Sequence, residues 1–387
     1  MRHGRRGMTL GGVVATLLVA AGLAGCGGGH DAAGTPTNSG GGVVRLGALL
    51  PLSGRSAPSG EAMRQAARLA IKEANDAGGV LGRRVELVVA DDACDPGTAV
   101  IAAHRMISQG VTVSVGGYCS SATVPTLPIF RDASVPMVIP AANSTELLQP
   151  GYDNVFLISG TVAAEARFAV ASMHRLGTAS LVIVHDATSF PATLANATAT
   201  AAAADGVPVT ATLELSQGAP TYARIAREVL ATRANMVYYT GYYAEANQLI
   251  RDLRTAGYQG KIMVGDGAAA TPLLGGLSAA QTQSLYGTAL LVPELMPSLS
   301  GWLSRYTSFG GSPPLVGTAE TYDAVTIALD AIKRAGTTEH AAVRRAIAQT
   351  SGLSLLSGPA RFAADGTRSN PSFLLLVVRA GRFVEVP

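Results

Sequence analysis

Apolar runs of strand length alternate with amphipathic, helix-length stretches along residues 43–387. The run over 43–50 precedes a helical pattern over 61–77, which Gly78 and Gly79 bring to an end. Runs that are apolar at every position and separated by helices are typical of parallel sheets covered on both faces. The sequence therefore predicts an α/β fold built from doubly wound parallel sheets.

The length of this body predicts two lobes, because residues 43–387 exceed what one compact core usually holds. Ligands are then expected at the carboxyl ends of the strands. The predicted strands are 43–50, 85–90, 111–116, 135–139, 181–185, 207–213, 236–240, 261–265 and 286–293, with a final hairpin over 373–378 and 383–386. The predicted helices are 61–77, 98–109, 124–132, the alanine-rich stretch after 185, 222–232, a stretch ending at 256, 318–334 and 339–348. No part of this body has the length and polarity of a membrane span.

The first 25 residues have the features of an export signal. Three arginines and no acids precede an apolar run over 10–24, which is shorter than the ~20 residues of a spanning helix. The run ends in Leu23-Ala24-Gly25-Cys26, which resembles the bacterial lipobox. That resemblance implies removal of residues 1–25 and a lipid on Cys26, with a flexible tether over 26–42. An ordinary cleaved signal is the alternative, and Arg5-Arg6 leaves a twin-arginine export route open.

Charge and missing motifs favour binding over catalysis. The chain has 29 basic and 26 acidic residues, so removing the three arginines of the signal leaves 26 of each. A neutral body gives no case for a nucleic-acid surface. Phosphate-loop, dinucleotide and nucleophile-elbow motifs are missing. There is also no Cys-x-x-Cys motif or Cys/His cluster, so we expect no enzyme, no cofactor and no metal.

The two cysteines of the body form an even pair. Once Cys26 is assigned to the anchor, Cys94 and Cys119 remain, and in an oxidising compartment they are expected to form a disulfide. Each follows a predicted strand. If these strands are neighbours in a parallel sheet, the two loops meet at one sheet edge.

Four segments of the body resemble one family. The runs 91–96 (DDACDP), 117–123 (GYCSSAT), 141–147 (AANSTEL) and 238–243 (YYTGYY) are similar to the leucine/isoleucine/valine-binding proteins of branched-chain amino acid ABC importers. The likeness extends from Val44 to the final hairpin. It implies a type I periplasmic-binding-protein fold, whose lobes are joined by a three-segment hinge and close over a ligand. The expected lobes are 43–161 plus 288–370, and 162–287 plus 371–387.

The resemblance also implies a ligand site. Ser120 matches a serine that holds the ligand carboxylate, which suits a hydroxyl beside a helix start, although an ordinary N-cap is the alternative. Ala141 matches a backbone contact, and Asn143 replaces the usual threonine. Tyr242 matches a tyrosine that touches the ligand head group, with a packing role as the alternative. Asp266 matches the acid that pairs with the ligand ammonium, although it could be a solvated turn residue.

Two further positions depart from the family and concern the ligand side chain. Ser59 stands where a large aromatic residue is frequent, and Phe190 stands where tyrosine is common. The implied protein is a monomeric lipoprotein on the outer face of the cytoplasmic membrane, which captures a small neutral, branched-chain amino acid and delivers it to ABC importer permeases. A ligand-sensing lipoprotein, or a binder of amides or small organic acids, is the alternative.

Overall fold

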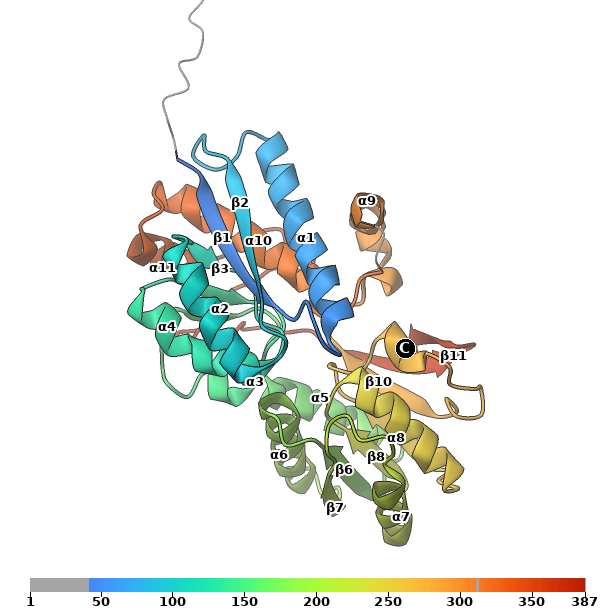
Figure 1. The fold of residues 1–387 in the computed structure, drawn as a ribbon. Helices are drawn as coiled ribbons and strands as arrows, with labels where there is room; N and C mark the ends of the chain where they lie inside the picture. The colour runs from blue at the N-terminus through green and yellow to red at the C-terminus, as the bar shows by residue number, and fades with distance from the viewer. Residues whose placement is uncertain (1–41, 311–312, 387) are drawn as a thin grey trace, which may run out of the picture. The chain divides into compact units, whose positions relative to one another are not determined.

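The computed structural model describes residues 42–310 and 313–386, which contain two β-sheets (Figure 1). The first sheet is parallel throughout. Its strands in spatial order are β2 (Val85–Asp91), β1 (Val44–Leu50), β3 (Val113–Ser114), β4 (Met137–Ile139) and β5 (Val155–Leu157).

The second sheet has seven strands and an antiparallel edge. Five strands are parallel, and the final hairpin adds two antiparallel strands beside β10. The order is β12 (Arg382–Glu385), β11 (Leu374–Arg379), β10 (Leu285–Ala289), β9 (Lys261–Val264), β8 (Met236–Tyr239), β6 (Leu181–His185) and β7 (Val209–Glu214).

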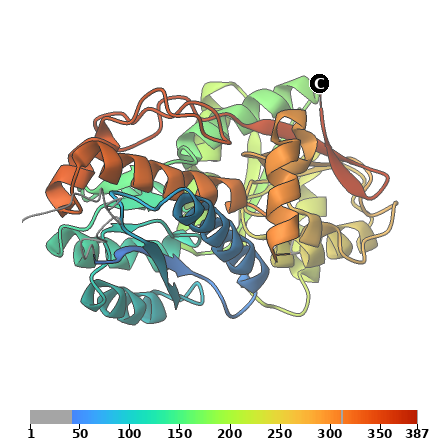
Figure 2. The ribbon, with the colours of Figure 1, turned by 90° about the horizontal axis from the view of Figure 1, so that it is seen from above.

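Helices cover both faces of each sheet. Alternate residues of β1 point into different cores, since Leu46 and Leu50 pack with helices α1, α10 and α11, whereas Leu49 packs with α2 and α4. Figure 2 shows α1 alongside α10. The helices of this lobe are α1 (Ala57–Asp76), α2 (Pro96–Ser108), α3 (Ser120–Thr123), α4 (Leu127–Asp132), α9 (Ser300–Gly310), α10 (Thr318–Ala335) and α11 (His340–Ala348).

The second sheet is covered in the same way. Helices α5 and α6 share one core, and α7 and α8 share the other. These helices are α5 (Val162–Arg175), α6 (Ser189–Ala204), α7 (Ala223–Thr232) and α8 (Tyr243–Thr255). Short 3-10 turns lie at η1 (Val124–Thr126), η2 (Thr145–Leu147), η3 (Thr271–Leu274), η4 (Pro293–Leu295) and η5 (Pro297–Leu299).

Three segments join the two lobes. The chain leaves the first sheet after β5 and enters α5, and it returns after β10 to α9, which packs with α1 and α10. It crosses again before β11, which belongs to the second sheet. This arrangement confirms the predicted fold class, whereas the exact residues at which the lobes divide stay a prediction. No helix among residues 42–310 and 313–386 is long and apolar enough to cross a membrane.

The helix predicted over 124–132 is instead divided into η1 and α4, and the short helix α3 precedes them. Pro125 and Pro128 explain the division, because each lacks a backbone N–H and crowds the preceding turn. The strand expected over 111–116 is only two residues long, and the strand predicted over 286–293 ends at Ala289. The prediction missed β5, α5 and α9 altogether.

Cys94 and Cys119 form a disulfide, with their Cα atoms 5.3 Å apart. The assumption behind the prediction was wrong in one respect. Strands β2 and β3 are not neighbours, because β1 lies between them. The disulfide therefore joins two loops across the end of β1. The predicted signal (1–25), Cys26 and the tether as far as residue 41 lie outside the described residues.

Candidate functional site

A small cavity lies where the carboxyl ends of strands from both sheets meet. Its volume is about 10 Å³, about the room that one water requires. We call it the cleft cavity. It is lined by Tyr118, Ala141, Asn143 and Val316 from the first lobe and by Phe190, Tyr242, Asp266 and Gly267 from the second. Ligands of doubly wound proteins bind at such strand ends.

Asp266 is the acidic group of the cleft cavity. It follows β9 and is only 4% exposed, so it is not a solvated turn residue. Asn143 Nδ2 donates to Asp266 Oδ2 at 3.4 Å from the opposite lobe. Burial and the nearby carboxyl of Glu165 raise the pKa of Asp266 well above its usual value.

Glu165, on α5, supports Asp266 and was missed in the sequence. Its Oε1 accepts hydrogen bonds from the Asp266 backbone N–H at 2.8 Å and from Thr288 Oγ1 at 2.7 Å. Burial raises the pKa of Glu165 to about 6. One signal could have found it. Glu165 lies on the same helical stripe as the buried Val162 and Ala169, where an acid is unexpected.

Three aromatic rings form the apolar wall of the cavity. The Tyr242 ring lies 5.9 Å from the Tyr118 ring and 5.6 Å from the Phe190 ring, measured between centroids. Tyr242 packs against the cores of both lobes. Burial raises the pKa of its hydroxyl, so this phenol stays protonated. Packing and ligand contact are both compatible with this position.

Of the predicted ligand-binding residues, Ser120 and Ser59 do not line the cleft cavity. Both are buried, Ser120 at the start of α3 and Ser59 in the first turn of α1. Ser120 Oγ accepts from the Ser144 backbone N–H at 3.3 Å. Cys119 is the N-cap of α3, so the N-cap alternative for Ser120 is wrong. The other five predicted residues line the cavity, and their ligand roles stay predictions.

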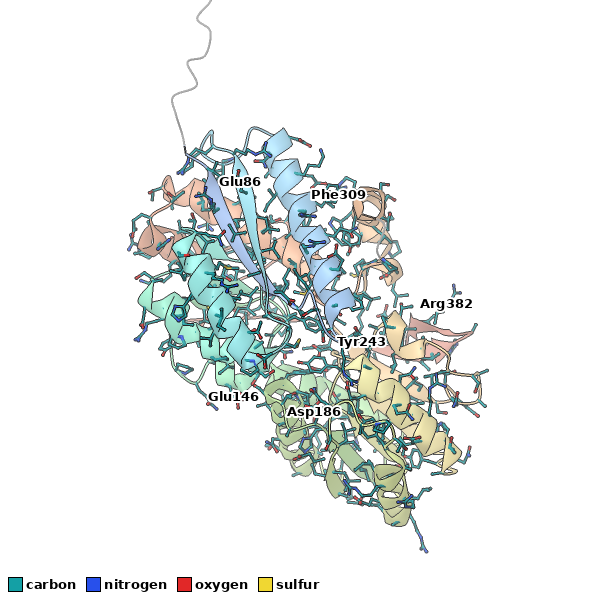
Figure 3. All side chains as sticks on the ribbon, viewed as in Figure 1. Glu86, Glu146, Asp186, Tyr243, Phe309 and Arg382 are labelled. Carbon is teal, nitrogen blue, oxygen red and sulfur yellow. A yellow bond between two sulfur atoms is a disulfide. The ribbon has the colours of Figure 1, made fainter. Side chains whose placement is uncertain are left out.

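Further contacts join the lobes around this cavity. Arg55 Nη1 lies 3.1 Å from Glu245 Oε1, and Tyr243 Oη donates to the backbone oxygen of Arg55 at 2.8 Å. Ser189 Oγ donates to Ser144 Oγ at 2.9 Å and also contacts Glu146. Figure 3 shows Tyr243 in the region where the lobes meet. These contacts hold the lobes together at the rim of the cavity.

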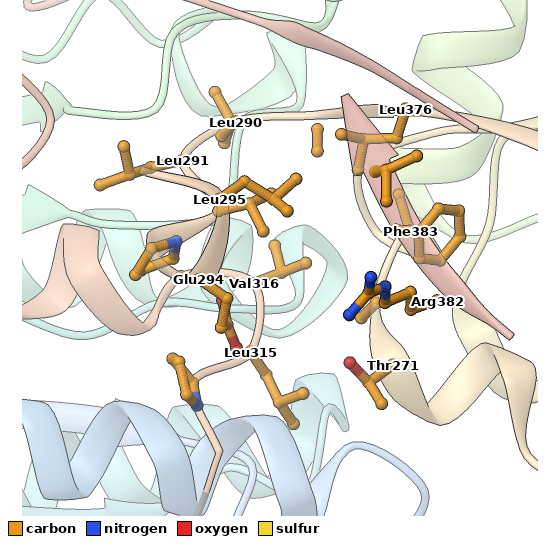
Figure 4. Close-up of a pocket in the computed structure, with 18 of the residues that line it drawn as sticks. Thr271, Leu290, Leu291, Glu294, Leu295, Leu315, Val316, Leu376, Arg382 and Phe383 are labelled. Atoms are coloured by element: carbon orange, nitrogen blue, oxygen red, sulfur yellow. The ribbon is translucent and has the colours of Figure 1, made fainter. Parts of the chain in front are cut away.

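A second, larger cavity lies beside the hinge and has a volume of about 370 Å³ (Figure 4). We call it the hinge cavity. Val316 lines both cavities. Its walls are mainly apolar, and Figure 4 shows the Arg382 side chain extending toward Val316 and Leu315. The hinge cavity also contains Glu320, whose pKa burial raises to about 7. No group of three or more His, Cys, Asp or Glu side chains in the described part of the chain could hold a metal ion.

Comparison with known proteins places this chain in a family. A family model described as "Periplasmic binding protein" matches residues 43–382. A Leu/Ile/Val-binding protein homolog of Brucella melitensis is 27% identical over 346 residues, which are 88% of this chain and 93% of the relative. A leucine-, isoleucine-, valine-, threonine- and alanine-binding protein of Pseudomonas aeruginosa is 26% identical over 79% of this chain and 82% of the relative.

A solved structure supports the same assignment. A leucine-binding protein of Thermotoga maritima has a TM-score of 0.82 and 25% identity, over 89% of this chain and 98% of that one. Two parallel-sheet lobes, three crossings and a cavity at the strand ends agree with this match. The chain belongs to the periplasmic binding protein family, of the leucine/isoleucine/valine-binding type.

Proposed function

We propose that this protein is an extracytoplasmic solute-binding lipoprotein that captures a small neutral amino acid, of the branched-chain class, for an ABC importer. One observation carries the proposal. Asp266 is a buried carboxyl group that lines a cavity between two lobes, and no cation is paired with it among the described residues. A buried carboxylate requires a cationic partner, and the α-ammonium group of an amino acid supplies one.

The remaining walls suit the rest of such a ligand. Tyr118, Phe190 and Tyr242 offer apolar surface to an aliphatic side chain. We assign the ligand carboxylate to Ser120 and to the backbone at Ala141, with Asn143 between carboxylate and ammonium. Because the cleft cavity is small with the lobes in contact, binding requires the lobes to part and close again around the ligand.

An apolar organic acid or an amide is the second candidate. The hinge cavity supports it, because Arg382 lies in its lining and could pair with a carboxylate, beside the two acids Glu294 and Glu320 that also line it. A ligand that occupied both cavities would be larger than leucine, and Val316, which lines both, lies between them.

Calorimetry distinguishes the two candidates. We expect leucine or valine to bind, and 4-methylpentanoate, which lacks the amine, to bind at least about 100-fold more weakly, because it leaves Asp266 buried and unpaired. Asp266→Ala should abolish leucine binding. Asp205→Asn, at an exposed acid on the end of α6, is the control and should bind like the wild type. Equal affinity for leucine and 4-methylpentanoate would refute the amino-acid assignment and favour the organic-acid candidate.

We also propose that Cys26 carries the lipid anchor, on the strength of the Leu-Ala-Gly-Cys motif. Several acyl chains are needed for stable anchoring, because a single chain binds only marginally. Metabolic labelling with a palmitate analogue should mark the wild type and spare Cys26→Ala. If deletion of the protein left uptake of its ligand unchanged, the protein would act as a sensor rather than as part of an importer.

A further inference from the structure

Glu165 and Asp266 form a pair of buried carboxyl groups at the second lobe's side of the cleft cavity. Glu165 has none of its surface exposed, and Asp266 has 4%. The backbone N–H of Asp266 donates to Glu165 Oε1 at 2.8 Å, so the two residues are tied together. Only Asp266 lines the cavity, which places Glu165 one layer behind any ligand there.

No cation among residues 42–310 and 313–386 balances this pair. The groups that face it are uncharged near neutral pH, because burial raises the pKa of each tyrosine among them. They are Tyr238 from β8, Thr288 from β10, Asn143 from the first lobe, and Tyr118 and Tyr242 across the cavity. No Lys, Arg or His in the described part of the chain forms an ion pair with either carboxyl. Ionising both of these neighbouring buried carboxyl groups would cost like-charge repulsion and desolvation. The pair therefore retains one proton.

We propose that Glu165 is a positioning residue whose charge, together with burial, keeps a proton on Asp266 in the empty site, and that capture of an ammonium ligand releases this proton to solvent. The proposal rests on the proposed function, since it assumes a ligand that carries an amine. It adds a role for a residue that does not touch the ligand, and it makes capture dependent on pH.

The assignment of the proton follows from the contacts of each carboxyl. Glu165 Oε1 receives two hydrogen bonds, from the Asp266 N–H and the Thr288 hydroxyl, and these favour its ionised form. Asp266 receives one long side-chain hydrogen bond, from Asn143, and one from the Gly267 backbone. Burial holds the pKa of Asp266 well above its usual range, whereas that of Glu165 is about 6. Near neutral pH, Asp266 is therefore the protonated member.

The balance of the binding step is simple. The ligand arrives with its ammonium protonated, the Asp266 O–H bond breaks, and its proton passes to the buffer. The Asp266 carboxylate then pairs with the ammonium, while Glu165 keeps its charge and its two donors. Because one proton leaves, affinity should rise with pH, by up to about tenfold per pH unit where Asp266 is protonated in the empty protein.

Two measurements on the full chain test the inference, one of them without ligand. Infrared difference spectroscopy at neutral pH should show a protonated carboxyl band in the wild type that is absent in Asp266→Asn. Calorimetry with leucine in phosphate and in Tris, whose ionisation enthalpies differ, should count close to one proton released per leucine bound.

Glu165→Gln is the decisive variant, because its amide oxygen can still accept from the Asp266 N–H and Thr288 while the charge is lost. We expect it to release fewer protons per leucine than the wild type, and its leucine affinity to depend less on pH between pH 6 and pH 8, because the neighbouring charge is lost while the burial of Asp266 remains. Glu214→Gln, an exposed acid at the end of β7, is the control and should behave like the wild type.

The outcomes separate this inference from the proposed function. If no amino acid binds, the proposed function is wrong, and the infrared band alone decides whether Asp266 is protonated. If leucine binds without releasing a proton, or if Glu165→Gln releases as much as the wild type, the role of Glu165 is refuted while the amino-acid assignment stands. A protonated carboxyl band of equal intensity in the wild type and in Asp266→Asn would also overturn the inference, whatever the fate of Glu165→Gln.

Discussion

Two buried acids of this molecule show how burial raises the pKa of a carboxyl group. Asp266 and Glu320 are both acids with almost no exposed surface, yet they lie in different cavities. Asp266 has a neighbouring carboxyl and Asn143, whereas Glu320 Oε1 has one long hydrogen bond from the Leu291 N–H, at 3.4 Å. Burial is the first cause that raises the pKa of each of these carboxyl groups. Such acids destabilise the ligand-free fold as the pH rises.

Glu320 allows a test of this loss of stability at higher pH. Its pKa is raised from 4.5 to about 7 in the folded protein. Between these two values the folded state binds more protons than the unfolded state, so the free energy of unfolding falls as the pH rises from 4.5 to about 7. The shift corresponds to a loss on the order of 3 kcal/mol. Urea unfolding at pH 5 and pH 7.5 should show a smaller loss in Glu320→Gln than in the wild type.

The exposed Glu385 at the end of β12 supplies the control for this measurement. Glu385→Gln should keep the wild-type dependence on pH. If Glu320→Gln and the wild type lose the same stability between pH 5 and pH 7.5, the Glu320 carboxyl is not held in its protonated form by the fold.

Secondary-structure elements differ in how far the sequence predicts them. Strands such as β6 could be predicted because they are short continuous apolar runs, and helix α10 because its apolar positions follow the helical period and Gly336 ends it. Helix α5 escaped prediction because Glu165 interrupts its apolar stripe, and that interruption is explained only by Thr288 and Asp266, which are far away in sequence. Resemblance supplied Asp266, whereas the only local signal of its partner Glu165 was an acid on an apolar helical stripe.

The loops that follow β2 and β3 depend on their disulfide. It closes a loop of 25 residues, so the chain-entropy argument gives a stabilisation of about 3 kcal/mol. We expect Cys94→Ser/Cys119→Ser to lower the free energy of unfolding by about that amount in urea titrations. The reduced wild type should behave like the double variant. A fully reduced protein as stable as the oxidised one would show that the crosslink contributes nothing.

At the scale of the whole molecule, the two lobes meet through few polar contacts. Each lobe has its own sheet and cores, and the rim contacts at Arg55, Tyr243 and Ser189 join loops and helix starts rather than core surfaces. Because these rim contacts are few, we expect the lobes to open readily. Ligand binding then shifts the balance between open and closed forms. Residues that touch no ligand can therefore change affinity.

Arg55 is the residue that tests this view of closure. Its side chain is 60% exposed, whereas its partner Glu245 is 3% exposed and keeps a second donor, the Gly218 N–H at 3.3 Å. Because an exposed ion pair contributes about 0–1 kcal/mol, Arg55→Ala should weaken ligand binding by at most about fivefold, and high salt should shrink the difference. Arg224→Ala, whose ion pair with Glu228 lies within α7, is the matched control and should leave affinity unchanged. Calorimetry of both variants at low and high salt measures these effects. If Arg55→Ala binds as tightly as the wild type at low salt, this contact does not contribute to closure, and the hinge and the cavity walls alone set the balance between the open and closed lobes.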